Sequence, residues 1–352
     1  MPIDVALLER ICKEPGPPGF ETRIRNVVLE ELEGLADEVR VDAMGNVVAL
    51  KKGKSSKMKA MAAAHMDEIG FIVTHVDKEG FLRFNPLGGF DAKTLTSQRV
   101  LVHGREDLLG VMGSKPIHIM TPEERNKPPR LEDYFIDLGL PGSEVEKLVT
   151  VGDPVTRERG LEEMGDCVNV ESLDNRASVF LLIESLRALK RSRRKPAYDF
   201  YGVFTVQEEV GLRGAHASTL EIQPDFSFGL DTTIAYDVPG SKPQEQCTRL
   251  GDGAGIKIMD SSVICDYRMV EFMKSVATAK KIRWQPEILR AGGTDTASLQ
   301  KMTAGGSIAG AISLPTRHVH QVIEMCHKQD IAHAIKLMAA CLCELDKHEW
   351  AF

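Results

Sequence analysis

The chain has 352 residues, of which 43% are hydrophobic and 27% are charged, an ordinary globular composition that can bury a sizeable core without disulfides. At roughly 150 residues per domain we expect about two domains. The net charge of −7 argues against a general nucleic-acid binder, which needs a basic surface to displace counterions from phosphates.

Hydropathy and cysteine content bear on where the protein works. No apolar run approaches the roughly 20 residues that a membrane span requires, and the first residues carry acids inside their only apolar stretch, which is not the pattern of a signal peptide. The seven cysteines show neither a CxxC pair nor a tight framework, which is typical of reduced thiols. We therefore expect a cytoplasmic protein that does not contact a membrane.

The first part of the chain alternates predicted helices with predicted strands. Residues 3–13 and 21–35 are predicted to be helical, the second because its apolar residues recur at spacings of four and three. The lysine-rich stretch 51–59 is predicted to be a loop. The mostly apolar run 59–64 then has the length and composition of a strand buried on both faces of a parallel sheet.

The segment 69–164 has a different pattern. Short β-rich runs alternate with Gly and Pro, and no clear amphipathic helix occurs until about 131–139. We therefore predict that this segment is a small β-rich domain, inserted into an α/β domain made of residues 1–68 and 165–352.

The pattern of buried strands returns after the insert. Strands are predicted at 200–206, 226–230 and 308–314, and helices at 177–190 and 329–346. The predicted fold class is therefore α/β, with a mixed, mostly parallel central sheet flanked by helices and the small β-rich domain inserted into it.

Polar side chains follow each of these apolar strands. In open α/β sheets, ligands bind outside the carboxyl ends of the strands. The set contains histidine and carboxylate but no cysteine, and mixed nitrogen and oxygen ligands suit Zn²⁺, Co²⁺ or Mn²⁺. Its members are His65, Asp67, Glu208, Glu209, Asp231 and His320, together with Asp174 at the start of a predicted helix.

Each of these residues also has an ordinary structural interpretation. His65 and Asp67 could be a surface pair, although residues two apart share one face of a strand, where an Asp can support a metal-binding His. The two adjacent glutamates could be a solvated acid pair. Asp174 could be a helix N-cap, Asp231 a cap or turn residue, and His320 a surface residue. The metal site is favoured because all of them fall at strand ends of one α/β domain.

In order and spacing, these segments resemble the M42 family of metal-dependent aminopeptidases. The resemblance spans nearly the whole chain, and segments 113–116 and 135–139 also resemble that family's insert. The chain has Asn175 where many relatives have Asp and His318 where many have Tyr, but no proposed ligand is missing. The segments that carry the resemblance are 64–70 (AHMDEIG), 173–176 (LDNR), 206–215 (VQEEVGLRGA), 230–231 (LD), 292–295 (GGTD) and 315–320 (PTRHVH).

The resemblance implies two divalent metal ions per subunit, with Zn²⁺ or Co²⁺ expected ahead of Mn²⁺. His65 and Asp231 would hold one ion, and Glu209 and His320 would hold the other. Asp174 would bridge the two ions with one oxygen on each.

The resemblance also assigns the acid–base roles. Neighbours on an extended chain point in opposite directions, so one ligand and one base is a sensible division of Glu208 and Glu209, but the residues alone do not say which is which. The resemblance makes Glu208 the general base and Glu209 the ligand, and it makes Asp67 the residue that orients His65.

The function implied by the resemblance is removal of N-terminal residues from short peptides by metal-activated water. The insert would mediate dimerisation, and dimers would assemble further, up to a dodecamer. One alternative is a glycoside hydrolase, because some M42 members have been labelled endoglucanases; a glycosidase needs two carboxylates that flank a sugar bond, whereas these glutamates are adjacent. The other alternative is an inactive metal-binding assembly protein, which the complete set of ligands and base disfavours.

Overall fold

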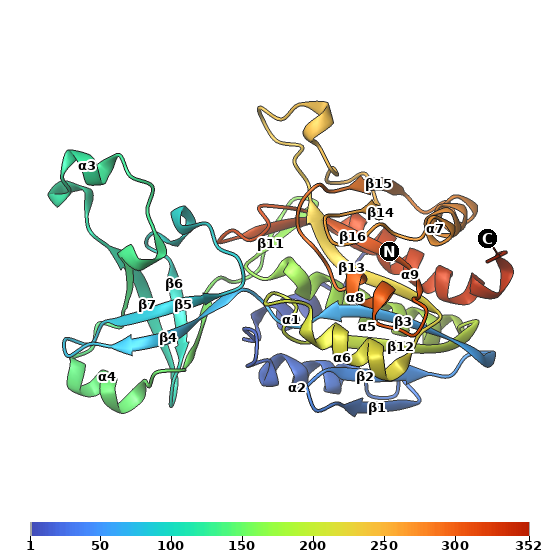
Figure 1. Cartoon of the computed structure of the whole chain (residues 1–352), viewed down its shortest axis with the longest axis horizontal. Helices are drawn as coiled ribbons and strands as arrows, with labels where there is room; N and C mark the ends of the chain where they lie inside the picture. Colours follow the sequence, from blue (N-terminus) through green and yellow to red (C-terminus); the bar gives the residue numbers. More distant parts are fainter. Residues whose placement is uncertain (1, 352) are drawn as a thin grey trace.

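The computed structural model describes residues 2–351, which form an α/β part and a small β barrel beside it (Figure 1). The α/β part is built on a mixed sheet that holds eleven strands among these residues. Its strands are β1 (Glu38–Val41), β2 (Val47–Lys51), β3 (Ser55–His65), β10 (Glu162–Met164), β11 (Cys167–Val170), β12 (Tyr198–Thr205), β13 (Phe226–Ile234), β14 (Ala254–Met259), β15 (Trp284–Ile288), β16 (Ile308–Arg317) and β17 (Glu324–His327).

The strands are arranged in the order β1-β2-β12-β3-β13-β16-β17-β11-β10, with β14 paired to β16 and β15 paired to β14. The four central strands, β12, β3, β13 and β16, are mutually parallel, so their carboxyl ends lie at one edge of the sheet. Antiparallel pairs join these strands to β2 on one side and to β14 and β17 on the other. The central strands are covered on both faces, which explains their nearly continuous runs of small and apolar residues.

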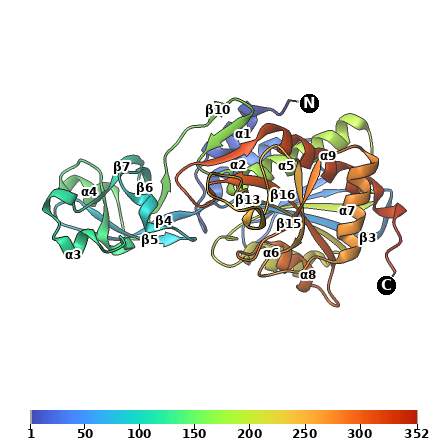
Figure 2. The same ribbon diagram turned by 90° about the horizontal axis from the view of Figure 1, so that it is seen from above.

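Helices pack on both faces of this sheet. Figure 2 shows α5 and α9 on one face and α6 and α8 on the other. Helix α5 is buried around most of its circumference because it lies between the sheet and the neighbouring helices, and Phe180 and Leu181 are fully buried. The helices of the α/β part are α1 (Val5–Lys13), α2 (Thr22–Glu31), α5 (Leu173–Ser192), α6 (Arg213–Ile222), α7 (Tyr267–Ala279), α8 (Thr296–Lys301) and α9 (Lys328–Glu344), with short 3-10 turns at η4 (Pro243–Glu245) and η5 (Leu345–Lys347).

The barrel closes in the order β4-β5-β8-β7-β6-β9 and has its own core, in which Phe71, Tyr134 and Ile136 are buried. It projects from the α/β part on the left in Figure 1. Its elements are β4 (Gly70–Val76), β5 (Leu82–Leu87), η1 (Ala92–Leu95), β6 (Arg99–His103), β7 (Asp107–Ser114), η2 (Ile117–Ile119), α3 (Pro122–Arg125), η3 (Leu131–Asp133), β8 (Tyr134–Asp137), α4 (Gly142–Leu148) and β9 (Pro154–Arg157).

The predicted α/β class, with helices on a mixed sheet and a small β-rich unit, is confirmed. Two local predictions are wrong. The helix expected at 131–139 is a 3-10 turn followed by strand β8, where Tyr134 and Ile136 point into the barrel and the period is two. The loop expected at 51–59 is short, because β3 already begins at Ser55 and its first residues are mostly exposed.

No helix among residues 2–351 is long and apolar enough to cross a membrane.

Candidate active site

The carboxyl ends of the central strands bring the polar residues together. His65 is the last residue of β3 and is paired in register with Thr205, the last residue of β12. Glu208 follows β12 by three residues, and His320 follows β16 by three residues. Asp231 lies inside β13 and not at its end as expected, because β13 continues to Ile234 along its parallel pairing with β16.

These side chains line one cleft of about 470 Å³, which is within the range of small-molecule sites. Of the residues predicted to form the site, all but Asp67 line it; they are His65, Asp174, Glu208, Glu209, Asp231 and His320.

Asp174 reaches the cleft from the start of α5. Its φ of −79° and ψ of 102° are not helical, and the peptide bond between Asp174 and Asn175 is cis. The Asn175 side chain donates to the carbonyl of Leu230 at 2.9 Å, which ties this turn to β13. The Asp174 side chain faces two histidines. The alternative interpretation of Asp174 as a helix N-cap is therefore wrong.

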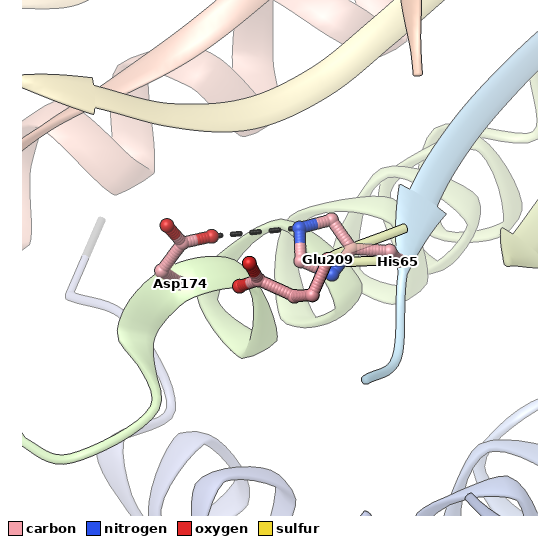
Figure 3. A group of neighbouring side chains, drawn as sticks. All are labelled: His65, Asp174 and Glu209. Carbon is pink, nitrogen blue, oxygen red and sulfur yellow. Dashed lines mark ion pairs between the residues drawn. The ribbon is translucent and has the colours of Figure 1, made fainter. Parts of the chain in front are cut away.

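The first group of contacts is centred on His65, which is buried. Its Nε2 atom lies 3.4 Å from Oδ1 of Asp174, 3.7 Å from Oδ1 of Asp231 and 3.7 Å from Oε2 of Glu208. Figure 3 shows His65 and Asp174 facing each other, with Glu209 beside them.

The second group is centred on His320, which is half-exposed. Its Nε2 atom lies 3.3 Å from Oδ2 of Asp174 and 3.4 Å from Oε2 of Glu209. Asp174 therefore presents a different carboxylate oxygen to each histidine.

Asp67 is fully buried and lies beside His65. The Nδ1 atom of His65 is 3.0 Å from the backbone carbonyl of Asp67 and 3.5 Å from its carboxylate. The same carboxylate accepts the backbone N–H groups of Glu208 at 3.0 Å and Glu209 at 3.1 Å. Asp67 thus fixes the turn that carries both glutamates, a contact that the sequence did not predict.

Burial and the concentration of acids shift the pKa values of several titratable groups here. Burial raises the pKa of Glu208 well above its usual value and also raises the pKa values of Glu209 and Asp231. Burial alone would lower the pKa values of the histidines, but the surrounding carboxylates raise that of His65 well above its usual value and that of His320 to about 11. The cleft therefore has a strong affinity for positive charge.

Two further acids border the site, and no role was predicted for either from the sequence. Asp295 belongs to the GGTD segment; it accepts the Thr205 hydroxyl at 2.5 Å, and burial raises its pKa to about 7. Glu324 accepts the backbone N–H of Asp174 at 2.7 Å and that of His320 at 3.0 Å. The feature of the sequence that could have indicated a role for Glu324 is its position four residues after His320.

A buried ion-pair cluster forms another part of the cleft wall. The ammonium group of Lys257 lies 2.7 Å from Glu287 and 3.1 Å from Asp260, and all three side chains are fully buried. Thr233 also donates to Glu287 at 2.7 Å. No spacing in the sequence indicates this cluster, because its members come from β14, the turn after it, and β15.

The donor set fits divalent metal ions. Two groups of side chains, His65 with Asp174 and Glu209 and His65 with Glu208 and Asp231, place one ligand atom each within 4.8 Å of one another. Imidazole nitrogen and carboxylate oxygen are the ligands expected for such ions. One carboxylate oxygen of Glu209 is buried with no hydrogen-bond partner, which a bound cation would satisfy.

Comparison with known proteins identifies the family. The sequence profile described as M42 glutamyl aminopeptidase matches residues 45–337. The chain is 32% identical to the lysyl aminopeptidase of Pyrococcus furiosus, over 97% of this chain and 98% of that protein.

Solved structures agree with this match. A TET aminopeptidase from the archaeon Thaumarchaeota archaeon SCGC AB-539-E09 has a TM-score of 0.94 and 36% identity, covering 97% of this chain and 96% of that one. The TET1 peptidase of Pyrococcus horikoshii, which can assemble into a tetrahedron or a large octahedral shell, has a TM-score of 0.86 and 30% identity, covering 97% and 99%. The chain therefore belongs to the M42 peptidase family and is an aminopeptidase.

Proposed function

We propose that this aminopeptidase uses two divalent metal ions, Zn²⁺ or Co²⁺ ahead of Mn²⁺, to remove N-terminal residues from short peptides. The observation that carries the proposal is the orientation of Asp174, whose two oxygens lie 3.4 Å from His65 and 3.3 Å from His320. A carboxylate placed in this way between two histidine-containing groups suits a bridging ligand. His65 and Asp231 would hold one ion, and Glu209 and His320 the other.

Bound ions would supply Lewis acidity, which polarises the peptide carbonyl and makes water a better nucleophile. Glu208 would act as general base, accepting a proton from the attacking water and returning it to the leaving amine. Its burial supports this role, because the raised pKa brings the carboxylate closer to that of a base working near neutral pH. Asp67 would hold both His65 and the turn that carries Glu208 in position.

The surplus of acids would also favour substrates with a free amino terminus. A peptide's α-ammonium group is a cation, and the cleft wall offers several carboxylates near the proposed ions. An N-acetylated peptide lacks that charge and carries an additional group in the same place. We therefore expect cleavage to be limited to the first peptide bond.

We also propose that residues 69–164 mediate dimerisation and that dimers assemble further, up to a dodecamer. The assemblies formed by the Pyrococcus horikoshii peptidase support the formation of a homo-oligomer. Large apolar side chains on the barrel, Leu109, Val111, Ile117 and Ile119, are between 44% and 66% exposed, and a partner would cover them. Multi-angle light scattering tests the proposal, and a monomer at micromolar concentration would contradict it.

A cytoplasmic location is part of the same proposal. The seven cysteines are all free thiols, and burial raises the pKa values of all five that are buried, so they are poorly reactive. Cell fractionation of the native protein is the direct test.

The decisive experiment is hydrolysis of aminoacyl chromogenic substrates, each free and N-acetylated, by chelated protein refilled with Co²⁺, Zn²⁺ or Mn²⁺. We expect metal-dependent cleavage of the free-amine forms alone. Cleavage that persists after complete chelation would refute the metal proposal. Stoichiometric metal without turnover would favour an assembly protein, and action on soluble cellulose would favour the glycosidase alternative.

A further inference from the structure

Glu324 is a fully buried carboxylate next to the backbones of Asp174 and His320. It is the first residue of β17, and its backbone is fixed by pairing with Val170 of β11 and by a 3.0 Å hydrogen bond from the side chain of Asn169 to its carbonyl. The mechanism proposed above gives it no part. A buried acid on a fixed strand needs an explanation, because burial of an unpaired carboxylate is costly.

The two oxygens of this carboxylate bind the backbones of two different elements. Oε2 accepts the N–H of Asp174 at 2.7 Å, at the start of α5. Oε1 accepts the N–H of His320 at 3.0 Å, in the turn after β16. These two residues are also the pair whose side chains meet, with His320 Nε2 3.3 Å from Asp174 Oδ2.

Neither residue is held by regular secondary structure at this point. His320 has a φ of +58°, in the left-handed region that residues other than glycine seldom adopt. Asp174 has non-helical angles although it lies within the limits of α5. Both N–H groups therefore need an acceptor from outside their own element, and Glu324 supplies both.

We propose that Glu324 is a positioning residue, which fixes the bridging aspartate and the second-site histidine relative to each other and so sets the affinity of the ion held by Glu209 and His320. This inference rests on the proposed metal site. A carboxylate is required because it offers two acceptor oxygens. Glutamine offers one oxygen and a donor NH₂, which would face one of the two N–H groups.

The test compares Glu324→Gln and Glu324→Asp with a matched control, Asp330→Asn. Asp330 is also a buried carboxylate that accepts two backbone N–H groups, those of Gly251 at 2.7 Å and Gly253 at 2.8 Å, but it does not line the cleft. The aspartate variant keeps the charge of Glu324 and shortens the side chain by one methylene, so it separates geometry from charge. It also provides a second variant if the glutamine variant does not fold.

Chelated full-length proteins are titrated with Co²⁺, and binding is followed by equilibrium dialysis and by the visible absorption of bound cobalt. We expect both Glu324 variants to bind the ion held by Glu209 and His320 about 10- to 100-fold more weakly, the range found when the supports of metal ligands are altered. The other ion shares only Asp174 with this site and should lose less affinity. The cobalt spectrum of the weaker site should also change. Asp330→Asn should bind both ions as wild type does, even where its metal-free form unfolds at a lower temperature.

Two results would overturn the inference: wild-type affinity at both sites in both Glu324 variants, or an equal loss of affinity in Asp330→Asn. Wild-type protein that binds no cobalt would refute the proposed metal site itself. That outcome is read from the wild-type titration alone, so it is distinguishable from a failure confined to Glu324.

Discussion

Replacing Glu208 by glutamine removes the proposed proton acceptor while keeping the size of the side chain. General-base catalysis contributes 10²- to 10⁴-fold, which at about 1.36 kcal/mol per factor of ten is about 3–5 kcal/mol of transition-state stabilisation. We expect the upper half of this range, because two neighbouring buried acids already have partners of their own. Asp67 already accepts two backbone N–H groups, and Asp295 accepts the Thr205 hydroxyl.

The same variant decides between the two glutamates. Geometry alone also allows Glu208 to be a ligand, because its Oε2 is as far from His65 Nε2 as Asp231 Oδ1 is, 3.7 Å in each case. If it is the base, Glu208→Gln binds two ions and has a lower kcat with a similar KM. Glu209→Gln, in contrast, should lose affinity for one ion.

Steady-state kinetics at saturating Co²⁺, combined with dialysis, measure both quantities on the same preparations. Full turnover by Glu208→Gln would refute its role as the base. Loss of one ion from Glu208→Gln, with both retained by Glu209→Gln, would exchange the two assignments.

Three further predictions concern charge and metal. Lys257→Met should destabilise the fold by about 3–5 kcal/mol in urea unfolding, because Asp260 and Glu287 lose their shared buried cation; a loss below about 1 kcal/mol would show that the pair is solvated or protonated. Chelation should lower the unfolding temperature, and Co²⁺ at 100 times its Kd should restore about 2.7 kcal/mol of unfolding free energy. An unfolding temperature that does not change with cobalt concentration would argue against a specific site. Metal binding near neutral pH should release protons, because carboxylates raise the pKa of His320 to about 11 in the metal-free protein whereas a ligand imidazole is neutral. Affinity should therefore rise with pH, and calorimetry in two buffers of different ionisation enthalpy counts the protons released.

The positions of the strand-end residues could be predicted because they follow from the order of apolar and polar residues along the chain. A strand covered on both faces has to be apolar along its length, so the first polar residue after it marks its end. His65 and Glu208 were located in this way, and the parallel registry of β3 and β12 places them at one edge. Asp231 was also located, although its strand continues beyond it because a parallel neighbour still pairs there.

What could not be predicted depends on elements that meet only in three dimensions. The segment 131–139 was expected to be a helix, and its strand form is imposed by pairing with β7 inside the barrel. The contact of Glu324 with Asp174 and that of Lys257 with Glu287 each join elements distant in the chain, so no local spacing reveals them. The division of roles between Glu208 and Glu209 is a matter of chemistry and was not resolved by either sequence or geometry.

A common principle connects the predicted and the unpredicted parts of the site. The proposed ligands Glu209 and His320 lie in turns beyond the strands, where the sheet no longer fixes the backbone, yet a metal site needs its ligands held to within about 0.5 Å. Two fully buried carboxylates hold the backbone of these turns in place. Asp67 accepts the N–H groups of both glutamates, and Glu324 accepts those of Asp174 and His320. Both acids therefore hold proposed ligands in place without lining the cleft themselves.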